Sequence, residues 1–194
     1  MKYVTSFFST LFFVSTGLYL LPHSIADAVT LSNGTLAQPA VGIAFTEPPR
    51  LVSASTPYGT TSFPNTTYYF TLEVPATAGE PLQQVTFNQI QGTEDIKFNQ
   101  KDTFAFEGTR NQQGSKLALK TVKGNDKQQT ITVTFDTPIA PGKTVTIGLQ
   151  TYENPFDDGV YLFGVKAFPS GEKTVGQFLG IGRFQFYGPM TTEN

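Results

Sequence analysis

Acidic side chains that are neighbours in the sequence are the residues best suited to chemistry. Two such clusters occur, Glu94-Asp95 and Asp157-Asp158, and Glu153 lies shortly before the second. Paired carboxylates can act as the acid and base of a glycosidase, or they can bind Ca²⁺ through oxygen. However, Asp157-Asp158-Gly159 has the composition of a turn, and side chains adjacent in a strand point to opposite faces of a sheet. We therefore expect solvated turns and no catalytic or metal-binding residue, with calcium bound by Glu153, Asp157 and Asp158 left open.

Histidine and cysteine, the side chains that most often activate nucleophiles and hold transition metals, are almost absent. The only histidine is His23 and there is no cysteine. If the first 28 residues are removed, the remaining chain lacks both. That composition excludes Ser-His-Asp and Cys-His catalysis, ordinary transition-metal sites and disulfides. The sequence therefore predicts a protein that is not an enzyme and has no cofactor.

Residues 1–28 predict a cleavable secretory signal peptide. Lys2 is the only early charge, an uncharged apolar run extends from Phe7 to Leu21, and small residues at Ala26 and Ala28 suit a signal peptidase. The run is shorter than the ~20 residues that cross a bilayer, so we expect no stable membrane anchor after cleavage. Residues 29–194 are then expected to form a single β-sandwich domain that is exported to the periplasm or the extracellular space.

Charge and aromatic content restrict the partners and the core. The formal net charge of −2 argues against nucleic acid and anionic lipid as partners. The 18 Phe and 8 Tyr predict a core built largely from aromatic rings. Exposed Tyr and Phe could also stack on sugar rings, although the lack of Trp disfavours a carbohydrate-binding module.

Alternation of apolar and polar residues predicts strands throughout the remaining chain. In Thr130 to Asp136, for example, Ile131, Val133 and Phe135 alternate with threonine. Gly159 to Phe168 is apolar on both faces and is expected to be a central strand. The other expected strands are Tyr68 to Val74, Gln84 to Ile90, Asp95 to Asn99, Lys116 to Lys120 and Val145 to Leu149, preceded by a first strand or two and a long surface loop within Val29 to Ser62.

Turn residues separate these runs, and no run has helical periodicity. About eight to ten strands without a helix predict an all-β fold, an antiparallel β-sandwich of the immunoglobulin-like kind. A jelly roll or a closed barrel is the alternative architecture.

Glycine and arginine residues invite functional interpretations that we disfavour. Gly176 to Tyr187 alternates glycine with phenylalanine, placing Phe178, Gly180, Gly182, Phe184 and Phe186 on one face. No helix follows the segment, so its glycines are expected to admit a neighbouring aromatic ring or backbone rather than a phosphate.

The arginines after residue 28 are Arg50, Arg110 and Arg183. Each guanidinium could pin a carboxylate of a ligand, but an internal ion pair, such as Arg110 with Glu107, is the favoured role.

Several stretches resemble a known family. They are Pro48-Pro49-Arg50-Leu51-Val52, Thr67 to Pro75, Ala78 to Gln83, Ala105 to Arg110 and the long run from Gly159 to Gly180. Over about Phe45 to Tyr187 the chain resembles a cyanobacterial family of exported proteins built on a domain of unknown function. The resemblance implies no activity, cofactor or site residue. It does imply an envelope with a thylakoid system, and hence the periplasm, outer surface, thylakoid lumen or medium as destination.

These observations favour an exported, non-catalytic binding or structural protein of the cell envelope or extracellular space. Its partner is expected to be a protein or an envelope polymer. The alternatives are a carboxylate-dependent carbohydrate-active enzyme and a calcium-stabilised adhesion or matrix module.

Overall fold

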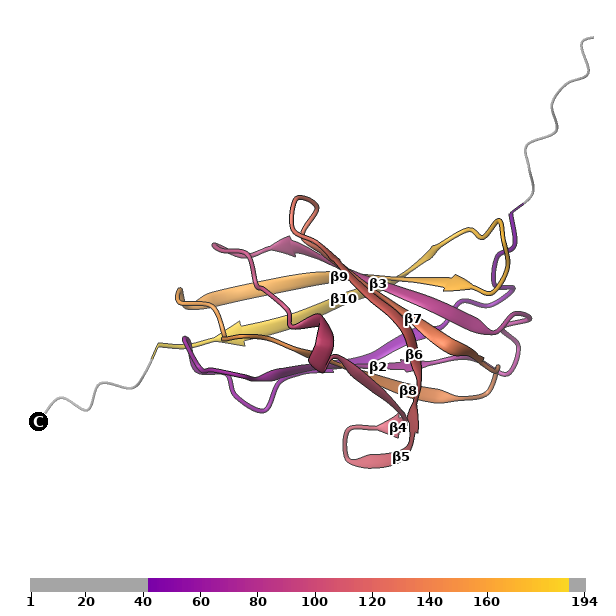
Figure 1. Cartoon of the computed structure of the whole chain (residues 1–194), viewed down its shortest axis with the longest axis horizontal. Coiled ribbons are helices and arrows are strands. Elements are labelled where there is room, and N and C mark those ends of the chain that lie inside the picture. The colour runs from indigo at the N-terminus through magenta and orange to yellow at the C-terminus, as the bar shows by residue number, and fades with distance from the viewer. Residues whose placement is uncertain (1–41, 189–194) are drawn as a thin grey trace, which may run out of the picture. The chain divides into compact units, whose positions relative to one another are not determined.

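The computed structural model describes residues 42–188, which form two packed antiparallel sheets of five strands each (Figure 1). The strand order is β1-β2-β8-β4-β5 in the first sheet and β10-β9-β3-β7-β6 in the second. The strands are β1 (Arg50–Ser55), β2 (Thr67–Glu73), β3 (Leu82–Gln91), β4 (Phe104–Thr109), β5 (Gln112–Leu117), β6 (Leu119–Asn125), β7 (Thr130–Ile139), β8 (Thr144–Gln150), β9 (Gly159–Pro169) and β10 (Gln177–Phe186). The predicted immunoglobulin-like sandwich is confirmed, and the predicted signal peptide lies outside the described residues.

The alternating strands bury the face that the sequence predicts. Ile131, Val133 and Phe135 of β7 are at most 3% exposed, and their threonine neighbours face outward. β9 pairs with β10 on one side and with β3 on the other, so the expectation of a central strand is confirmed. The only helix in 42–188 is the short 3-10 helix η1 (Gln100–Asp102). No helix within this range is long and apolar enough to cross a membrane.

Aromatic rings join the two sheets, as the composition predicts. Tyr68 and Phe70 of β2 lie in one sheet, and Phe163 of β9 and Phe184 of β10 lie in the other. The ring centroids of Tyr68 and Phe184 are 4.6 Å apart, and those of Phe70 and Phe163 are 6.2 Å apart. All four rings are at most 2% exposed. Such contacts add to the apolar area that each ring removes from water, and they stabilise a sandwich that has no disulfide.

Two predicted strands are wrong because the chain changes sheets there. Asp95 to Asn99 carries the chain from β3 in the second sheet towards β4 in the first, and it makes only an isolated bridge between Phe98 and Thr151. Lys116 to Lys120 is divided, since β5 ends in the first sheet at Leu117 and β6 begins in the second at Leu119. A segment that crosses between layers cannot keep one continuous row of pairing partners.

The face assigned to Phe178 is also wrong. The register of β10 against β9 shifts between Phe178 and Gly180, where Gly180 has a φ of 133°. The extra residue of this bulge reverses the alternation. Phe178 is therefore 63% exposed, whereas Phe184 and Phe186 lie in the core.

Candidate functional site

The two acidic clusters meet at one end of the sandwich. Glu94 lies in the β3–β4 loop and Asp157 in the β8–β9 loop, 63 positions further along the chain. The Glu94 carboxylate accepts a hydrogen bond of 2.8 Å from the backbone N–H of Asp157. Acids from the two loops therefore come together, and the adjacent Glu94 and Asp95 line one pocket with Glu153.

A pocket of about 210 Å³ lies between these two loops. The polar residues that line it are Glu94, Asp95, Lys97, Tyr152, Glu153 and Asn154. Within 42–188, no group of three His, Cys, Asp or Glu residues is arranged to hold a metal ion. Carboxylate oxygens accept hydrogen bonds from hydroxyl and amide groups.

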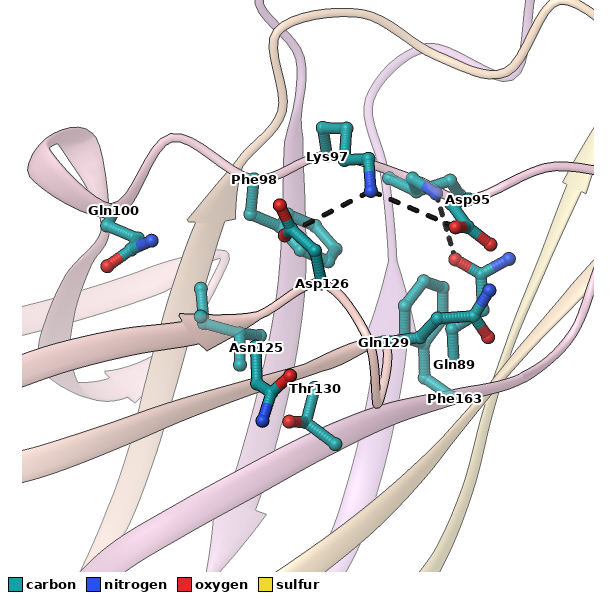
Figure 2. Close-up of a pocket in the computed structure, with 13 residues that line it drawn as sticks. Gln89, Asp95, Lys97, Phe98, Gln100, Asn125, Asp126, Gln129, Thr130 and Phe163 are labelled. Carbon is teal, nitrogen blue, oxygen red and sulfur yellow. Dashed lines mark hydrogen bonds and ion pairs between the residues drawn. The ribbon is translucent and has the colours of Figure 1, made fainter.

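A smaller cavity of about 40 Å³ adjoins this pocket (Figure 2). Lys97 Nζ lies over its mouth, 3.8 Å from Asp95 and 4.0 Å from Asp126. The Gln89 amide closes one side, accepting from Ile96 N at 2.9 Å and donating to Glu94 O at 2.7 Å. The cavity holds only a few water molecules, so it contributes to positioning the β3–β4 loop and not to binding an organic ligand.

Asn154, which is 1% exposed, fixes the loops at this end. Its Nδ2 donates to the backbone oxygens of Tyr58 at 3.0 Å and Thr60 at 2.7 Å. Its backbone N–H donates to Phe63 O at 2.8 Å. One buried amide thus joins the β1–β2 loop to the β8–β9 loop, and its hydrogen bonds make both loops parts of one ordered surface.

Four aromatic side chains are exposed on these loops and beside them. The exposed fractions are 48% for Tyr58, 58% for Tyr152, 79% for Phe156 and 62% for Tyr187. Tyr187 follows β10 directly, and its backbone N–H donates a hydrogen bond of 2.9 Å to Gly59 O in the β1–β2 loop. We call residues 56–66, 91–99, 151–158 and Tyr187 the loop end. The sequence did not reveal it, because composition alone cannot separate surface rings from the core rings.

Tyr58 and Phe63 stack face to face with their centroids 4.0 Å apart. This pair holds the exposed Tyr58 ring in a fixed orientation. A ring that is already ordered loses less conformational entropy when a ligand binds to it.

Two buried tyrosines beneath the loop end are structural. Burial raises the pKa of Tyr68 well above its ordinary value, and neighbouring Tyr161 and Glu94 add to the rise. The Tyr161 hydroxyl lies 2.7 Å from Thr93 Oγ1 and 3.1 Å from Asp157 O, and burial raises its pKa as well. Both phenols are therefore neutral hydrogen-bonding groups at physiological pH, not nucleophiles.

The arginines are all engaged within the protein. The Arg110 guanidinium lies 5.0 Å from the centroid of the Tyr69 ring, and Glu107 is bound instead by Lys143 Nζ at 2.7 Å. The predicted Arg110–Glu107 ion pair is therefore wrong. The Glu107 carboxylate pairs with Lys143 instead, and the Arg110 guanidinium packs over the Tyr69 ring in a cation–π contact. Arg183 donates to Gln185 Oε1 at 2.6 Å.

Arg50 binds Glu47, which also accepts from Thr77. The hydrogen bonds from Thr77 and Arg50 lower the pKa of Glu47.

Gly182 of β10 admits neighbouring side chains, as predicted, whereas a Cβ on Gly180 would meet no atom closer than 3.9 Å. A Cβ on Gly182 would lie 2.7 Å from Phe70 Cε1 and 2.9 Å from Ala54 Cβ. Gly182 therefore lets β10 approach the β1 side of the first sheet. The strand continues to Phe186, so no helix follows these glycines to bind a phosphate.

Two sheets of antiparallel strands with loops gathered at one end define an immunoglobulin-like β-sandwich. The chain belongs to the family described as protein of unknown function (DUF2808), which matches residues 42–186. No curated protein sequence matches it.

Several solved structures are similar to this chain at low sequence identity. BslA, described as a bacterial hydrophobin, is 16% identical over 77% of this chain and 100% of its own, with a TM-score of 0.46. An uncharacterised immunoglobulin-like protein from Nocardia farcinica is 14% identical over 69% and 96%, with a TM-score of 0.42. The collagen-binding domain of a Staphylococcus aureus adhesin is 10% identical over 76% and 99%, with a TM-score of 0.38. These are likenesses of fold, and no site residue is transferred from them.

Proposed function

We propose that the protein is an exported, non-catalytic binding module of a cyanobacterial cell envelope or extracellular matrix, and that its loop end binds an envelope polymer of uncharged sugars. The single observation that carries the proposal is the set of four exposed aromatic rings on the loop end, where one of them, Tyr152, lines a pocket that also contains three carboxylates. The predicted signal peptide and the family resemblance support export and cyanobacterial origin.

The chemistry of the loop end matches a neutral sugar better than a charged ligand. Aromatic faces pack against the C–H faces of sugar rings, and the carboxylates of Glu94, Asp95 and Glu153 can accept hydrogen bonds from hydroxyl groups. Their negative charge would repel an acidic polymer. A protein partner would also bury aromatic rings, so it is the alternative that the experiment must separate.

The carboxylate-dependent enzyme is the weaker candidate. Glycoside hydrolysis needs one carboxyl group on each side of the scissile bond, both open to the substrate. Here an oxygen of Glu94 is occupied by the Asp157 N–H, and Asp95 lies within ion-pair distance of Lys97. The remaining lone pairs of these carboxylates can still accept hydrogen bonds, but no pair of them is set on opposite sides of an open cleft for acid–base catalysis.

Binding of the purified protein to a panel of neutral glycans and envelope fractions tests the proposal. The double variant Tyr152→Ala/Phe156→Ala should weaken binding about tenfold or more, because each lost ring removes an aromatic contact. The matched control is Phe178→Ala/Ile181→Ala, which removes two exposed apolar side chains from β10 and should leave affinity unchanged. Capture of a protein with no glycan bound, or equal losses in the two variants, would contradict the proposal.

Cell fractionation tests the export part. We expect the processed protein in the periplasm or the medium, with its N-terminus at Val29. A chain that keeps residues 1–28 and stays in the cytoplasm would refute export. It would not affect the proposed sugar binding, which the binding assay tests separately.

A further inference from the structure

A second surface lies on the flank where the chain crosses from β5 to β6. Two open grooves of about 490 and 400 Å³ run there, and both are lined by Lys101 and Thr103. Lys116 lines the larger groove and Lys120 the smaller. We call Lys101, Lys116 and Lys120 with these two grooves the basic flank. The two grooves adjoin, because Lys101 and Thr103 line both.

The three ammonium groups of the basic flank carry uncompensated charge. Within 42–188, neither Lys101, Lys116 nor Lys120 is paired with a carboxylate, whereas Lys97 and Lys143 are. Asp102 is the single acid that lines either groove in this range, and it accepts a hydrogen bond of 2.6 Å from Asn99 Nδ2. A positive patch on a protein with a net charge of −2 selects an anionic partner.

The floor of the larger groove is aromatic and rigid. Phe104 and Phe106 stack with their centroids 6.2 Å apart on the outer face of the first sheet. Gly148 leaves room for the Phe104 ring, and Phe106 is 5% exposed although it lies outside the core cluster. Gln113 in this groove, and Gln100 and Thr121 in the other, add hydrogen-bonding groups around the apolar floor.

We propose that the basic flank binds an acidic polysaccharide whose chain lies along both grooves. Lys101 stands at the junction, and Lys116 and Lys120 stand one in each groove, so successive carboxylates of the polymer meet successive ammonium groups. The partly exposed Phe104 ring packs against an apolar sugar face, and the polar side chains bind hydroxyl groups. The acidic loop end would repel the same polymer, so the two surfaces bind different ligands and this inference does not depend on the proposed function.

Polygalacturonate and its methyl ester form a matched pair of probes, since they share a backbone and differ in carboxylate charge. The full protein should bind polygalacturonate at low salt, bind the methyl ester at least tenfold more weakly, and lose affinity as salt rises. The triple variant Lys101→Gln/Lys116→Gln/Lys120→Gln should bind polygalacturonate at least about tenfold more weakly, because it removes three exposed ion pairs between lysine and polymer carboxylate.

The control variant Lys166→Gln/Lys173→Gln/Arg183→Gln changes the net charge equally and should keep the wild-type affinity. Thermal melting of each variant verifies that it is folded. The proposal is overturned if wild-type protein does not bind polygalacturonate, if it binds the methyl ester equally well, or if both triple variants lose the same affinity. Equal affinity for single-stranded DNA would overturn it in favour of a general polyanion site. Tyr152→Ala/Phe156→Ala should leave polygalacturonate binding intact, so failure at one surface is distinguishable from failure at the other.

Discussion

The hydroxyl of Tyr68 donates a hydrogen bond to Asn154 Oδ1 over 3.1 Å, and both side chains are at most 1% exposed. Tyr68 stands in β2 at the centre of the aromatic core, and Asn154 stands in the β8–β9 loop. The same Asn154 amide donates to Tyr58 O and Thr60 O. This one contact therefore connects the core to the loops that carry the exposed aromatic rings.

Asn154→Ala should lower the free energy of unfolding by about 2–4 kcal/mol, because it leaves the Tyr68 hydroxyl and two loop carbonyls without their partner. Urea denaturation measures this loss. Tyr68→Phe removes only one of these hydrogen bonds and should cost less, about 1 kcal/mol. A cost for Asn154→Ala below that of Tyr68→Phe would contradict the role of the amide as the link between the loops.

The strands could be predicted from the sequence because burial has a local signature. In β2 and in β7 as far as Phe135 every second residue is apolar and buried, so the period of two is visible without knowledge of the partners. The Asn154 amide has no such signature. Its partners lie in β2 and in the β1–β2 loop, and only the packing of the sheets brings them together.

Gly182→Ala should destabilise the protein by about 1–3 kcal/mol, because the new methyl group would collide with Phe70 and Ala54. Thermal melting and urea denaturation measure the effect. Gly164→Ala in neighbouring β9 is the control. There a Cβ would lie 3.4 Å from Phe178 and 3.6 Å from Ile90, ordinary contacts that a sheet tolerates. Equal stabilities for the two variants would show that the close approach at Gly182 is relieved without cost.

Two errors of the sequence interpretation share one physical cause. Predicting which face a side chain occupies from alternate positions requires continuous pairing between strands. The bulge beside Gly180 interrupts the pairing of β10 with β9, so the side chains before it point to the opposite face and Phe178 is exposed. The change of sheet between Leu117 and Leu119 likewise interrupts a run that looks continuous in the sequence. The basic flank was missed for the same reason, since its lysines come together only where the chain changes sheets.

Removal of divalent cations should leave the thermal midpoint unchanged. The described residues contain no group of three acidic or other ligating side chains suited to a metal, so calcium has no cluster through which to stabilise the fold. Melting with a chelator, and again with millimolar calcium, measures this. A midpoint that rises with calcium and falls with chelator would establish a structural ion. Replacing Glu153, Asp157 and Asp158 would then test whether these residues bind the ion.

The stability of the protein should fall steeply at alkaline pH because of Tyr68. Burial raises the pKa of this phenol above its unfolded value of 10.0, so the folded state keeps a proton that the unfolded state releases. The stabilising effect is complete below pH 10 and is lost as pH rises further, at about 1.4 kcal/mol per pH unit for one proton. Tyr161, whose pKa is also raised, acts in the same direction.

Urea denaturation of wild type and Tyr68→Phe from pH 8 to pH 11 measures the slope. The variant should lose stability less steeply above pH 10, while Tyr152→Phe, the same exchange on an exposed ring, should follow the wild type. Parallel curves for wild type and Tyr68→Phe would mean that the Tyr68 hydroxyl ionises as readily in the folded protein as in the unfolded chain, contrary to its burial against Asn154.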